Sequence, residues 1–491
     1  MRHSIRFLRR GRVVEMSGFH PRTTLLDYLR LNERSLGTKE GCAEGDCGAC
    51  TVVLARPREG RLAFEPVNAC ILLLGQVDGV ELITVEDLAG EDGLHPVQAA
   101  MVAHHGSQCG FCTPGIVMSL FALYHGPRPA TRDAVNDALA GNLCRCTGYR
   151  PIVDAALEAC AAPPCDRFTE RRAATESALA ALDDGADLFV GNDMRFFAAP
   201  ASEDALAALC EAHPDATLVA GCTDVGLWVT KALAPLDRII WLGRVKELDR
   251  IEDSAEMLSL GATASLARAH AALASLDPDL GELMRRFGGM QVRVAGTVGG
   301  SIANGSPIGD LAPAFLALGA TLELRNGARL RTLPLEEFFL AYRRQDRAPG
   351  EFVRRAIVRK PRADEAFRCH KVTKRFDEDI SSVMGVFRLR LDGRRVAEAR
   401  VAYGGMAEVP KRAGEAEAAL TGASLDDPRS WEAALATLSR DFTPLDDQRA
   451  SAAYRTLVAR NLLFKALTEI ACGGTADTRL SGRRKLPVAA E

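Results

Sequence analysis

The chain has 491 residues, of which 47% are hydrophobic and 25% are charged, and its formal net charge at pH 7 is −3. This composition predicts a globular protein of about three domains, and the small net charge gives no argument for nucleic acid or a membrane surface as partner. We find no apolar run of about 18 residues that would predict a membrane span. Since the first ten residues also lack the apolar core of a signal peptide, we expect a cytoplasmic protein.

The N-terminal part predicts a small mixed sheet with one helix and a long loop. Residues 4–16 alternate as two short strands that turn at Arg10-Gly11, and a helix is expected over Leu25–Leu31. Further strands are expected at Thr51–Ala55 and Gly79–Thr84. The long loop between the helix and the third strand is rich in cysteine and glycine.

This loop carries cysteines with the spacing C-x4-C-x2-C, and one more cysteine follows downstream. The four residues are Cys42, Cys47, Cys50 and Cys70. That spacing is typical of a plant-type ferredoxin, in which four thiolates hold one [2Fe-2S] cluster. Gly45 and Gly48 would let the backbone curl, so that its N–H groups can point at the sulfurs. A zinc knuckle or ordinary buried thiols are the alternatives.

Residues 96–160 lack strand alternation and predict four short helices, which suit a bundle. Thr113-Pro114-Gly115 is expected to open a helix that runs to about Tyr124, with threonine as cap and proline in the first turn. Thr131 opens the next, which ends near Gly141, and an alanine-rich helix starts at Arg150.

A second cysteine set lies in this helical part. It consists of Cys109, Cys112, Cys144 and Cys146, spaced C-x2-C and C-x-C, with each pair shortly before a predicted helix. Helix N-termini favour the thiolate form, so four thiolates could meet at one metal centre. Zinc is the alternative to a second iron–sulfur cluster. The remaining cysteines are interpreted as ordinary thiols: Cys160, Cys165, Cys210, Cys222, Cys369 and Cys472.

Residues 161–185 are polar and alanine-rich and are predicted to be a linker. Strands and helices then alternate from about 186 to 360. In this region Leu218–Gly226 predicts a strand, a tight turn and the start of a helix, a geometry that offers backbone N–H groups to a diphosphate. Gly296–Asp310 has five glycines in fifteen residues, which favours close approach of the backbone to a ligand. A plain turn and a long surface loop are the alternatives.

The last part, residues 365–475, predicts strands near 384–391 and 396–405, followed by helices at about 430–439 and 446–470. The polar tail after Gly473 is expected to fray.

The segments Gly41–Cys50, Gln108–Gly115 and Gly141–Ile152 resemble, in order and spacing, the molybdenum hydroxylase family. The resemblance is to the small iron–sulfur/FAD subunit of its bacterial xanthine dehydrogenase branch. It implies a multidomain α+β fold. The implied parts are a ferredoxin-like β-grasp [2Fe-2S] domain (1–85), a four-helix [2Fe-2S] domain (86–160), the linker (161–185), a vanillyl-alcohol-oxidase-type FAD domain (186–362), a C-terminal α+β flavoprotein domain (363–475) and a tail (476–491).

The resemblance also implies the site residues. The two cysteine sets would hold two [2Fe-2S] clusters. FAD contacts would come from Leu218, Val219, Ala220, Gly221, Cys222, Thr223, Asp224, Val225, Gly226, Phe287, Thr297, Gly299, Gly300, Ser301, Asp310, Val353 and Lys371. Phe287 would lie by the isoalloxazine ring, and Ser301 stands where family members often have asparagine. The loop Lys371–Asp379 matches one that borders the flavin and influences NAD access; a solvated charged loop is the alternative reading.

The implied function is electron transfer in the oxidation of hypoxanthine to xanthine and of xanthine to urate. Electrons would pass from molybdenum to the helical-domain cluster, the ferredoxin cluster, FAD and then NAD+, with no catalytic residue on this chain. We expect the molybdopterin to be on a separate large subunit, in a heterotetramer of two small and two large subunits. The same wiring in a hydroxylase for aldehydes, nicotinate or another heterocycle is an alternative, as is a non-catalytic redox sensor. Oxygen could replace NAD+ as acceptor.

Overall fold

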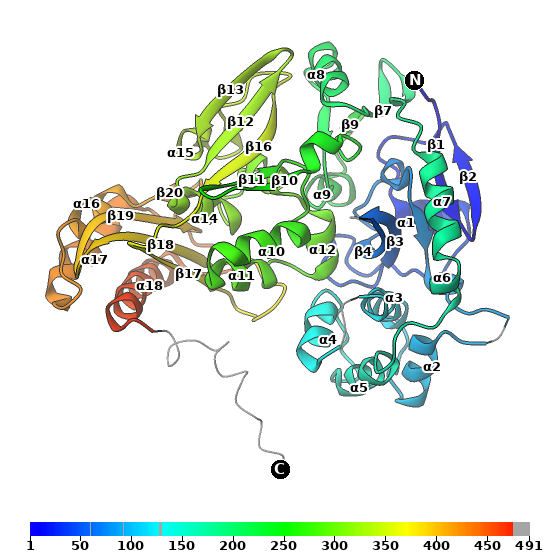
Figure 1. Cartoon of the computed structure of the whole chain (residues 1–491), viewed down its shortest axis with the longest axis horizontal. Helices are drawn as coiled ribbons and strands as arrows, with labels where there is room; N and C mark the ends of the chain where they lie inside the picture. The colour runs from blue at the N-terminus through cyan, green and yellow to red at the C-terminus, as the bar shows by residue number, and fades with distance from the viewer. Residues whose placement is uncertain (59, 92, 127–129, 475–491) are drawn as a thin grey trace.

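The computed structural model describes residues 1–58, 60–91, 93–126 and 130–474; the predicted tail 476–491 lies outside these residues. Figure 1 shows the parts side by side: the N-terminal sheet, the helical domain beneath it, a central α/β region and a C-terminal domain at the far end. The predicted multidomain α+β class is confirmed. Within the described ranges, no helix combines the length and apolar character needed to cross a membrane.

The N-terminal sheet has the strand order β2-β1-β5-β3-β4. Its strands are β1 (Ile5–Arg9), β2 (Arg12–Met16), β3 (Thr51–Arg58), β4 (Arg61–Asn68) and β5 (Glu81–Ile83). β1 and β5 are parallel, whereas the other pairs are antiparallel, as a β-grasp requires. The expected helix starts as α1 (Leu25–Asp27) and continues as a π-helical turn over Tyr28–Asn32.

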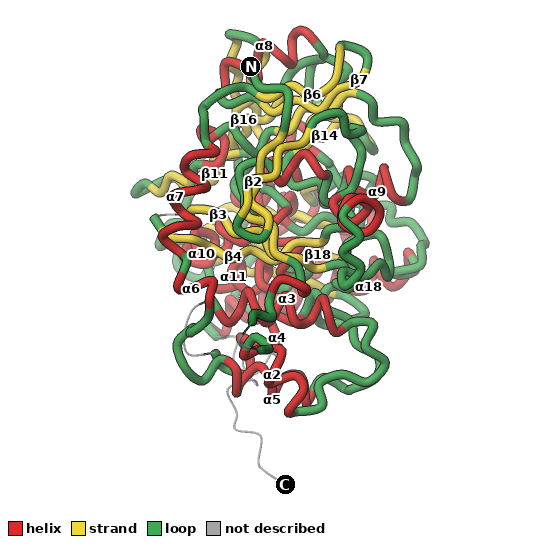
Figure 2. The backbone as a smooth tube through the Cα atoms, turned by 90° about the vertical axis from the view of Figure 1, so that its right-hand side faces the viewer, coloured by secondary structure: helices red, strands yellow, loops and turns green. Residues whose placement is uncertain are grey.

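The helical domain confirms the predicted helices. They are α2 (Pro96–Ala103), α3 (Thr113–Tyr124), α4 (Arg132–Leu139) and α5 (Arg150–Ala159). Thr131 caps α4 by accepting a hydrogen bond from the backbone N–H of Ala134, and proline stands in the first turn of each of the other three. Figure 2 shows α2, α4 and α5 gathered at one end of the molecule.

The segment 161–185, expected to be a linker, contains α6 (Arg167–Glu170) and α7 (Arg172–Leu182). Leu179 and Leu182 of α7 are buried in the hydrophobic core that also contains Leu8 of β1 and Val53 of β3. Figure 1 shows α7 lying along the N-terminal sheet. The alanines that suggested a linker form a helix because leucines spaced three apart give that helix a face to bury.

The central region has one sheet with the order β6-β7-β9-β8 and another with the order β10-β11-β16-β12-β13. The strands are β6 (Leu188–Asn192), β7 (Arg195–Ala199), β8 (Thr217–Val219), β9 (Arg238–Trp241), β10 (Ile251–Asp253), β11 (Met257–Gly261), β12 (Thr321–Asn326), β13 (Arg329–Pro334), β14 (Phe339–Ala341), β15 (Arg344–Gln345) and β16 (Phe352–Arg359). The helices are α8 (Glu203–Ala212), α9 (Val225–Thr230), α10 (Leu266–Leu276), α11 (Pro278–Arg285), α12 (Met290–Ala295), α13 (Val298–Ala303), α14 (Leu311–Leu318) and α15 (Leu335–Phe338). The expected alternation of strands and helices over 186–360 is confirmed.

The C-terminal domain packs a sheet of order β17-β18-β19-β20 against three helices of the described range. The strands are β17 (Glu365–Val372), β18 (Val383–Asp392), β19 (Arg395–Gly404) and β20 (Lys411–Arg412). The helices are α16 (Gly414–Leu420), α17 (Glu432–Asp441) and α18 (Ala452–Cys472). The start expected for the last helix, residue 446, was wrong by six residues, because Ser451 is the residue that caps it. Phe315 of α14 shares a core with Met384 and Val386 of β18, so this domain and the central region are packed together.

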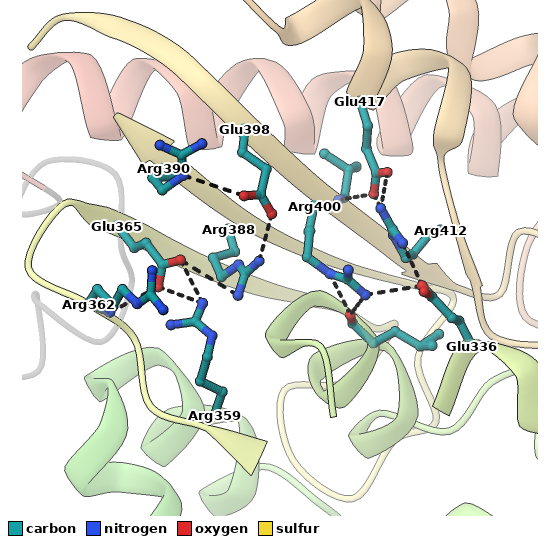
Figure 3. A network of polar contacts seen from close by, with 12 residues as sticks. Glu336, Arg359, Arg362, Glu365, Arg388, Arg390, Glu398, Arg400, Arg412 and Glu417 are labelled. Atoms are coloured by element: carbon teal, nitrogen blue, oxygen red, sulfur yellow. Dashed lines mark hydrogen bonds and ion pairs between the residues drawn. The ribbon is translucent and has the colours of Figure 1, made fainter. Parts of the chain in front are cut away.

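Ion pairs cross the same boundary (Figure 3). Glu336 of α15 pairs with Arg400 of β19 at 3.1 Å and with Arg412 of β20 at 2.5 Å. Arg359 of β16 pairs with Glu365 of β17 at 2.6 Å. The pairs of Glu336 are partly exposed and contribute little individually, so the shared apolar core is the main connection between the two domains.

Candidate metal and cofactor sites

The first cysteine set converges in the loop that precedes β3. The thiol of Cys42 contacts the thiols of Cys47 and Cys70, and the thiol of Cys70 also contacts that of Cys50. Gly45 and Gly48 have φ values of +80° and +67°, which glycine adopts without steric cost. The expected curl of the backbone is therefore present, and it brings the four predicted ligands together.

Backbone N–H groups point at one of these sulfurs, as predicted. The N–H groups of Glu44 and Cys47 lie 3.4 Å and 3.3 Å from Cys42 Sγ. Hydrogen bonds from Cys47 and Cys70, with these backbone groups, hold the pKa of Cys42 well below its ordinary value despite its burial. Four soft sulfur donors at one point, with backbone N–H groups aimed at one of them, fit an iron–sulfur cluster.

The second cysteine set also converges, in pairs. Cys112 contacts Cys144, and Cys109 contacts Cys146. Cys112 is the residue from which α3 begins. Cys109 and Cys146 are exposed, whereas Cys144 is buried, so this set lies at the surface. The soft donors again fit an iron–sulfur cluster.

Thr147 and Tyr149 fix the loop of the second set, and neither was predicted. Thr147 Oγ1 lies 3.2 Å from Cys144 Sγ. Burial raises the pKa of Cys144, but hydrogen bonds from Thr147 and from nearby backbone N–H groups lower it by more. The pKa of Cys144 therefore lies below its ordinary value. The hydroxyl of Tyr149 accepts a hydrogen bond from Cys144 N at 2.8 Å. Tyr149 has φ +68°, a left-handed conformation that the loop imposes on it.

The two cysteine loops are in direct contact. The backbone N–H of Leu143 donates to the carbonyl oxygen of Cys47 at 3.0 Å, which links a residue of the first set to the neighbour of Cys144. A Cβ added to Gly48 would lie 2.0 Å from Gly141 O, and one added to Gly115 would lie 2.1 Å from Gly48 O. Side chains at these positions would push the two sets apart.

The predicted diphosphate turn lies between β8 and α9. Cys222 is buried with φ +63°, and a Cβ on Gly221 would lie 1.7 Å from Ala295 O. Two side chains that sequence reasoning missed hold this turn. The amide of Gln76 and the indole N–H of Trp241 both donate to Ala220 O, at 3.0 Å and 3.1 Å. Gln76 belongs to the N-terminal domain, so the turn is supported from across a domain boundary.

The second glycine-rich stretch forms α13, which Thr297 caps by accepting from Gly300 N at 3.1 Å. Downstream, Asp310 forms a buried ion pair with Lys371 and accepts a hydrogen bond from Ser381. Asp310 and Lys371 are far apart in sequence, and both were predicted as FAD contacts. The structure brings them together, and Ser381 joins them as an unpredicted partner.

A cavity of about 70 Å³ is lined by Ala220, Gly221, Trp241 and Thr297, together with Arg56 and Arg58 of β3. It connects the diphosphate turn with the cap of α13, and it is smaller than the pockets that hold whole ligands, so FAD would occupy more than this space. Two predicted FAD contacts do not line this cavity. Val353 is buried in the hydrophobic core of the central region, and Phe287 packs against the same core. Their assignment to FAD stays a prediction, as do the remaining contacts.

The charged loop 371–379 lies between the central region and the first cysteine loop. The guanidinium of Arg286 stacks over Phe376 at 4.4 Å from the ring centre, and Arg375 pairs with Asp46 at 3.8 Å. Burial, with the negative charge of Asp46, raises the pKa of Glu378 to about 9. The loop is thus partly packed and carries a neutral carboxyl group at pH 7, so it is more than a solvated charged loop.

Helix α9 leads from the diphosphate turn directly to the first cysteine loop. Thr230 Oγ1 donates to Ala43 O at 2.7 Å, and Lys231 Nζ donates to Cys42 O at 2.5 Å. A Cβ on Gly226 would lie 2.5 Å from Ile71 O, the neighbour of Cys70. The flavin-type turn and the first cysteine set are therefore adjacent.

Outside the two cysteine sets, three side chains that could ligate a metal lie together. They are His95, His125 and Asp166, and their ligand atoms lie within 4.8 Å of one another. Both imidazole Nε2 atoms contact Asp166 Oδ2, at 2.8 Å and 2.9 Å. His95 Nδ1 accepts from Val97 N at 3.2 Å, so the proton of this ring is on Nε2 and is donated to the carboxylate. We therefore interpret the group as a hydrogen-bonded clamp that holds the start of α6 against the helical domain.

Replacing Asp166 with alanine is expected to destabilise the chain by about 3 kcal/mol, because buried donors on two imidazoles lose their acceptor. Burial raises the pKa of Asp166, but hydrogen bonds from His125 and His95 outweigh it and lower the net pKa. The stabilisation should therefore be complete above the unfolded pKa of about 3.9 and decline as the pH falls below it. Urea unfolding at pH 7 and pH 3.5 would measure this.

Asp166→Asn is the matched control, since the amide oxygen keeps the shape and one acceptor. It should cost less than alanine and should abolish the extra loss of stability at pH 3.5. If both variants unfold like the wild type at both pH values, the carboxylate is not the centre of the clamp.

Comparison with protein families agrees with this geometry. Family models match residues 11–74 (2Fe-2S iron–sulfur cluster binding domain) and 84–157 ([2Fe-2S] binding domain). Others match 192–361 (FAD binding domain in molybdopterin dehydrogenase) and 368–470 (CO dehydrogenase flavoprotein C-terminal domain).

Among curated proteins, xanthine dehydrogenase of Emericella nidulans is 32% identical over 89% of this chain, and that of Drosophila subobscura is 34% identical over 82%. The chain spans 36% and 34% of their lengths. Among solved structures, a chain of carbon monoxide dehydrogenase from Hydrogenophaga pseudoflava matches with TM-score 0.53 and 26% identity, covering 55% of this chain and 95% of its own. A chain of quinoline 2-oxidoreductase from Pseudomonas putida 86 matches with TM-score 0.51 and 26% identity, covering 56% and 96%.

Proposed function

From the premise that the chain belongs to the molybdenum hydroxylase family, with its iron–sulfur and FAD domains in order, we propose a specific role. The chain is the electron-transfer part of a xanthine dehydrogenase. It carries electrons from a molybdenum centre through two [2Fe-2S] clusters to FAD and on to NAD+. Electron transfer through iron–sulfur and flavin domains in an enzyme of this family follows from the matched domains; the substrate, the acceptor and the partner are the proposal.

The observation that carries the proposal is the continuous line of sites. The surface-lying second cysteine set touches the first set through the hydrogen bond between Leu143 and Cys47. The first set touches α9 through Lys231 and Thr230. Electron transfer needs short separations, and this order supports a path that begins at the exposed set, where a partner could deliver electrons, and ends at the diphosphate turn.

The chain's own residues would bind and position. When bound, the clusters carry single electrons and the flavin combines two of them into a hydride. The eight cysteines of the two sets would be the metal ligands. The N–H groups of Glu44 and Cys47 would raise the reduction potential of the first cluster. The turn at Ala220-Gly221 and the Asp310–Lys371 pair would hold FAD.

We assign NAD+ as acceptor because the loop 371–379 lies beside the predicted flavin site and is held by Arg286. A packed loop can keep an approach to the flavin open for a nicotinamide. Anaerobic addition of NADH to the purified chain tests this: the flavin should bleach and reduced-cluster signals should follow. Reduction by dithionite but not by NADH would contradict the assignment.

The molybdopterin would be on a large partner subunit in the cytoplasm, in an assembly of two small and two large subunits. A solved structure supports this assignment, because the matched carbon monoxide dehydrogenase chain is covered over 95% of its length by this chain. The domain division 1–85, 86–160, 186–362 and 363–475 is part of the same proposal.

Purines are the proposed substrates because the xanthine dehydrogenases match the iron–sulfur and flavin parts together, over 82–89% of this chain. The solved carbon monoxide and quinoline enzymes match only 55–56% of it. A redox sensor would have no use for a flavin site. Co-purification with the native partner, followed by a screen of hypoxanthine, aldehydes and nicotinate with NAD+, tests the substrate. Turnover of an aldehyde or nicotinate but not of purines would overturn it.

A further inference from the structure

A buried polar network lies where the N-terminal, helical and flavin domains meet. Its members are Thr51 of β3, Ser119 of α3, Asn142 of the second cysteine loop and Gln291 of α12, all at most 2% exposed. Buried polar side chains in such a position are costly unless they bond to one another. None of these four residues was singled out by the cysteine or glycine motifs as a functional residue.

Gln291 is the centre of this network. Its amide nitrogen lies 3.0 Å from Thr51 Oγ1, 3.1 Å from Ser119 Oγ, 3.0 Å from Asn142 Oδ1 and 3.3 Å from Gly141 O. One side chain of the flavin domain therefore reaches both iron–sulfur domains. Its other amide atom, Oε1, is buried without a hydrogen-bond partner. A buried acceptor without a hydrogen bond destabilises the fold, and an apolar side chain of the same size would avoid this loss.

The network continues to the cysteine loops themselves. Asn142 donates to Gly48 O at 3.2 Å, and Gly48 lies between Cys47 and Cys50. Thr51 Oγ1 donates to the same carbonyl at 2.6 Å. Gln291 is thus bonded to the residue after Cys50 and to the residues that precede Cys144. The contact between the two cysteine loops is held at this point.

Gly141 leaves the space that the amide of Gln291 occupies. A Cβ at this position would lie 1.8 Å from Gln291 Oε1, and the three nearest atoms it would meet all belong to the Gln291 side chain. The φ of Gly141 is not in the left-handed region, so the backbone itself would accept another residue. A side chain at this position would therefore displace the Gln291 amide from the network.

We propose that Gln291, from the flavin domain, is a positioning residue that sets the separation of the two iron–sulfur clusters from each other. The proposal rests on the proposed function, since it assumes that both cysteine sets hold clusters. Through Asn142 and Thr51, Gln291 locks the loop of one cluster against the loop of the other. The electronic contact between the clusters then depends on a side chain that ligates neither of them.

The test uses the full chain and compares Gln291→Met, Gln291→Ala, Gly141→Ala and the double variant Gln291→Ala/Gly141→Ala. Methionine keeps the volume but not the hydrogen bonds. Gln98→Ala removes a glutamine that bonds Val85 O within the iron–sulfur domains and is the control. Each protein is assayed for iron, acid-labile sulfide and flavin, and then reduced with dithionite. The magnetic splitting between the two reduced clusters and their potentials are read by electron paramagnetic resonance.

Gln291→Met should keep its iron but change the splitting and shift at least one potential, whereas Gln98→Ala should match the wild type. Gly141→Ala should lower the iron content at least about threefold, and Gln291→Ala should restore it in the double variant, because coupled neighbours are non-additive. Unchanged splitting and potentials in Gln291→Met, or a double variant no better than Gly141→Ala, would overturn the proposal. Wild-type protein without iron would instead refute the proposed function as well.

Discussion

Replacing Cys42 with serine is expected to remove the ferredoxin-type cluster and to slow electron transfer between the second cluster and the flavin by about 100-fold or more. That is a larger effect than losing a hydrogen-bond partner of a metal ligand. The thiol of Cys42 contacts two other thiols of its set and receives two backbone N–H groups. A hydroxyl is a poor ligand for iron in place of a soft thiolate. With this cluster gone, the line of sites has a gap in its middle.

The measurement is electron paramagnetic resonance of the reduced variant together with its flavin content. One cluster signal should disappear, and the other signal and the flavin should remain. Cys165→Ser is the matched control, since Cys165 is an exposed cysteine outside both sets. Retention of both cluster signals in Cys42→Ser would show that Cys42 is not a ligand.

Gly221→Ala is expected to lower the flavin content at least about tenfold while iron stays at the wild-type level. The added Cβ would lie 1.7 Å from Ala295 O, a backbone atom that cannot rotate away. Either the diphosphate turn or the end of α12 must move, and both line the same cavity. Since 1.4 kcal/mol is a tenfold change in binding, strain of a few kcal/mol suffices for this loss.

Gly414→Ala is the control for this substitution, because a Cβ at Gly414 meets nothing within 4 Å. The amount of flavin released on denaturation is measured relative to protein and to iron. This ratio distinguishes damage to the flavin site from damage to the fold. A Gly221→Ala protein with full flavin and unchanged NADH-dependent bleaching would place the cofactor elsewhere. Equal loss of iron and flavin would indicate that the substitution unfolds the chain.

The elements nearest the cysteines were predicted well because their signals are local. Cysteine spacing, Thr113-Pro114 and Thr131 predicted the loops and the starts of α3 and α4, and the structure has these helices at the expected residues. The threonine cap expected for α3 was wrong, because Cys112 occupies the cap position and its side chain makes no cap hydrogen bond, whereas Thr131 caps α4 as expected. Such caps depend on side chains within one turn. The convergence of Cys70 with the loop of Cys42 joins more distant residues, and the plant-type ferredoxin pattern suggested it before the family resemblance did.

Strand β4 was missed for a different reason. It contains Pro66, which argues against a central strand, but β4 is the last strand of its sheet and has a free edge there. The helix α7 was missed because its alanines show no strong pattern until Leu179 and Leu182 meet the neighbouring domain. In both cases the decisive partner is remote in sequence.

The supporting residues of the site were beyond sequence reasoning. Gln76 reaches Ala220 from another domain, and Gln291 reaches Thr51 over 240 positions. Neither belongs to a motif with fixed spacing, and a single glutamine has no local signal. Domain packing determines their roles, so they become visible only when the domains are seen in contact.

The most direct test is chemical analysis of the purified chain combined with its visible spectrum before and after reduction. Two [2Fe-2S] clusters and one flavin predict about four iron atoms, about four acid-labile sulfides and one FAD per chain, with bleaching of both absorptions by dithionite. A colourless protein that contains zinc instead of iron and releases no flavin would contradict the account.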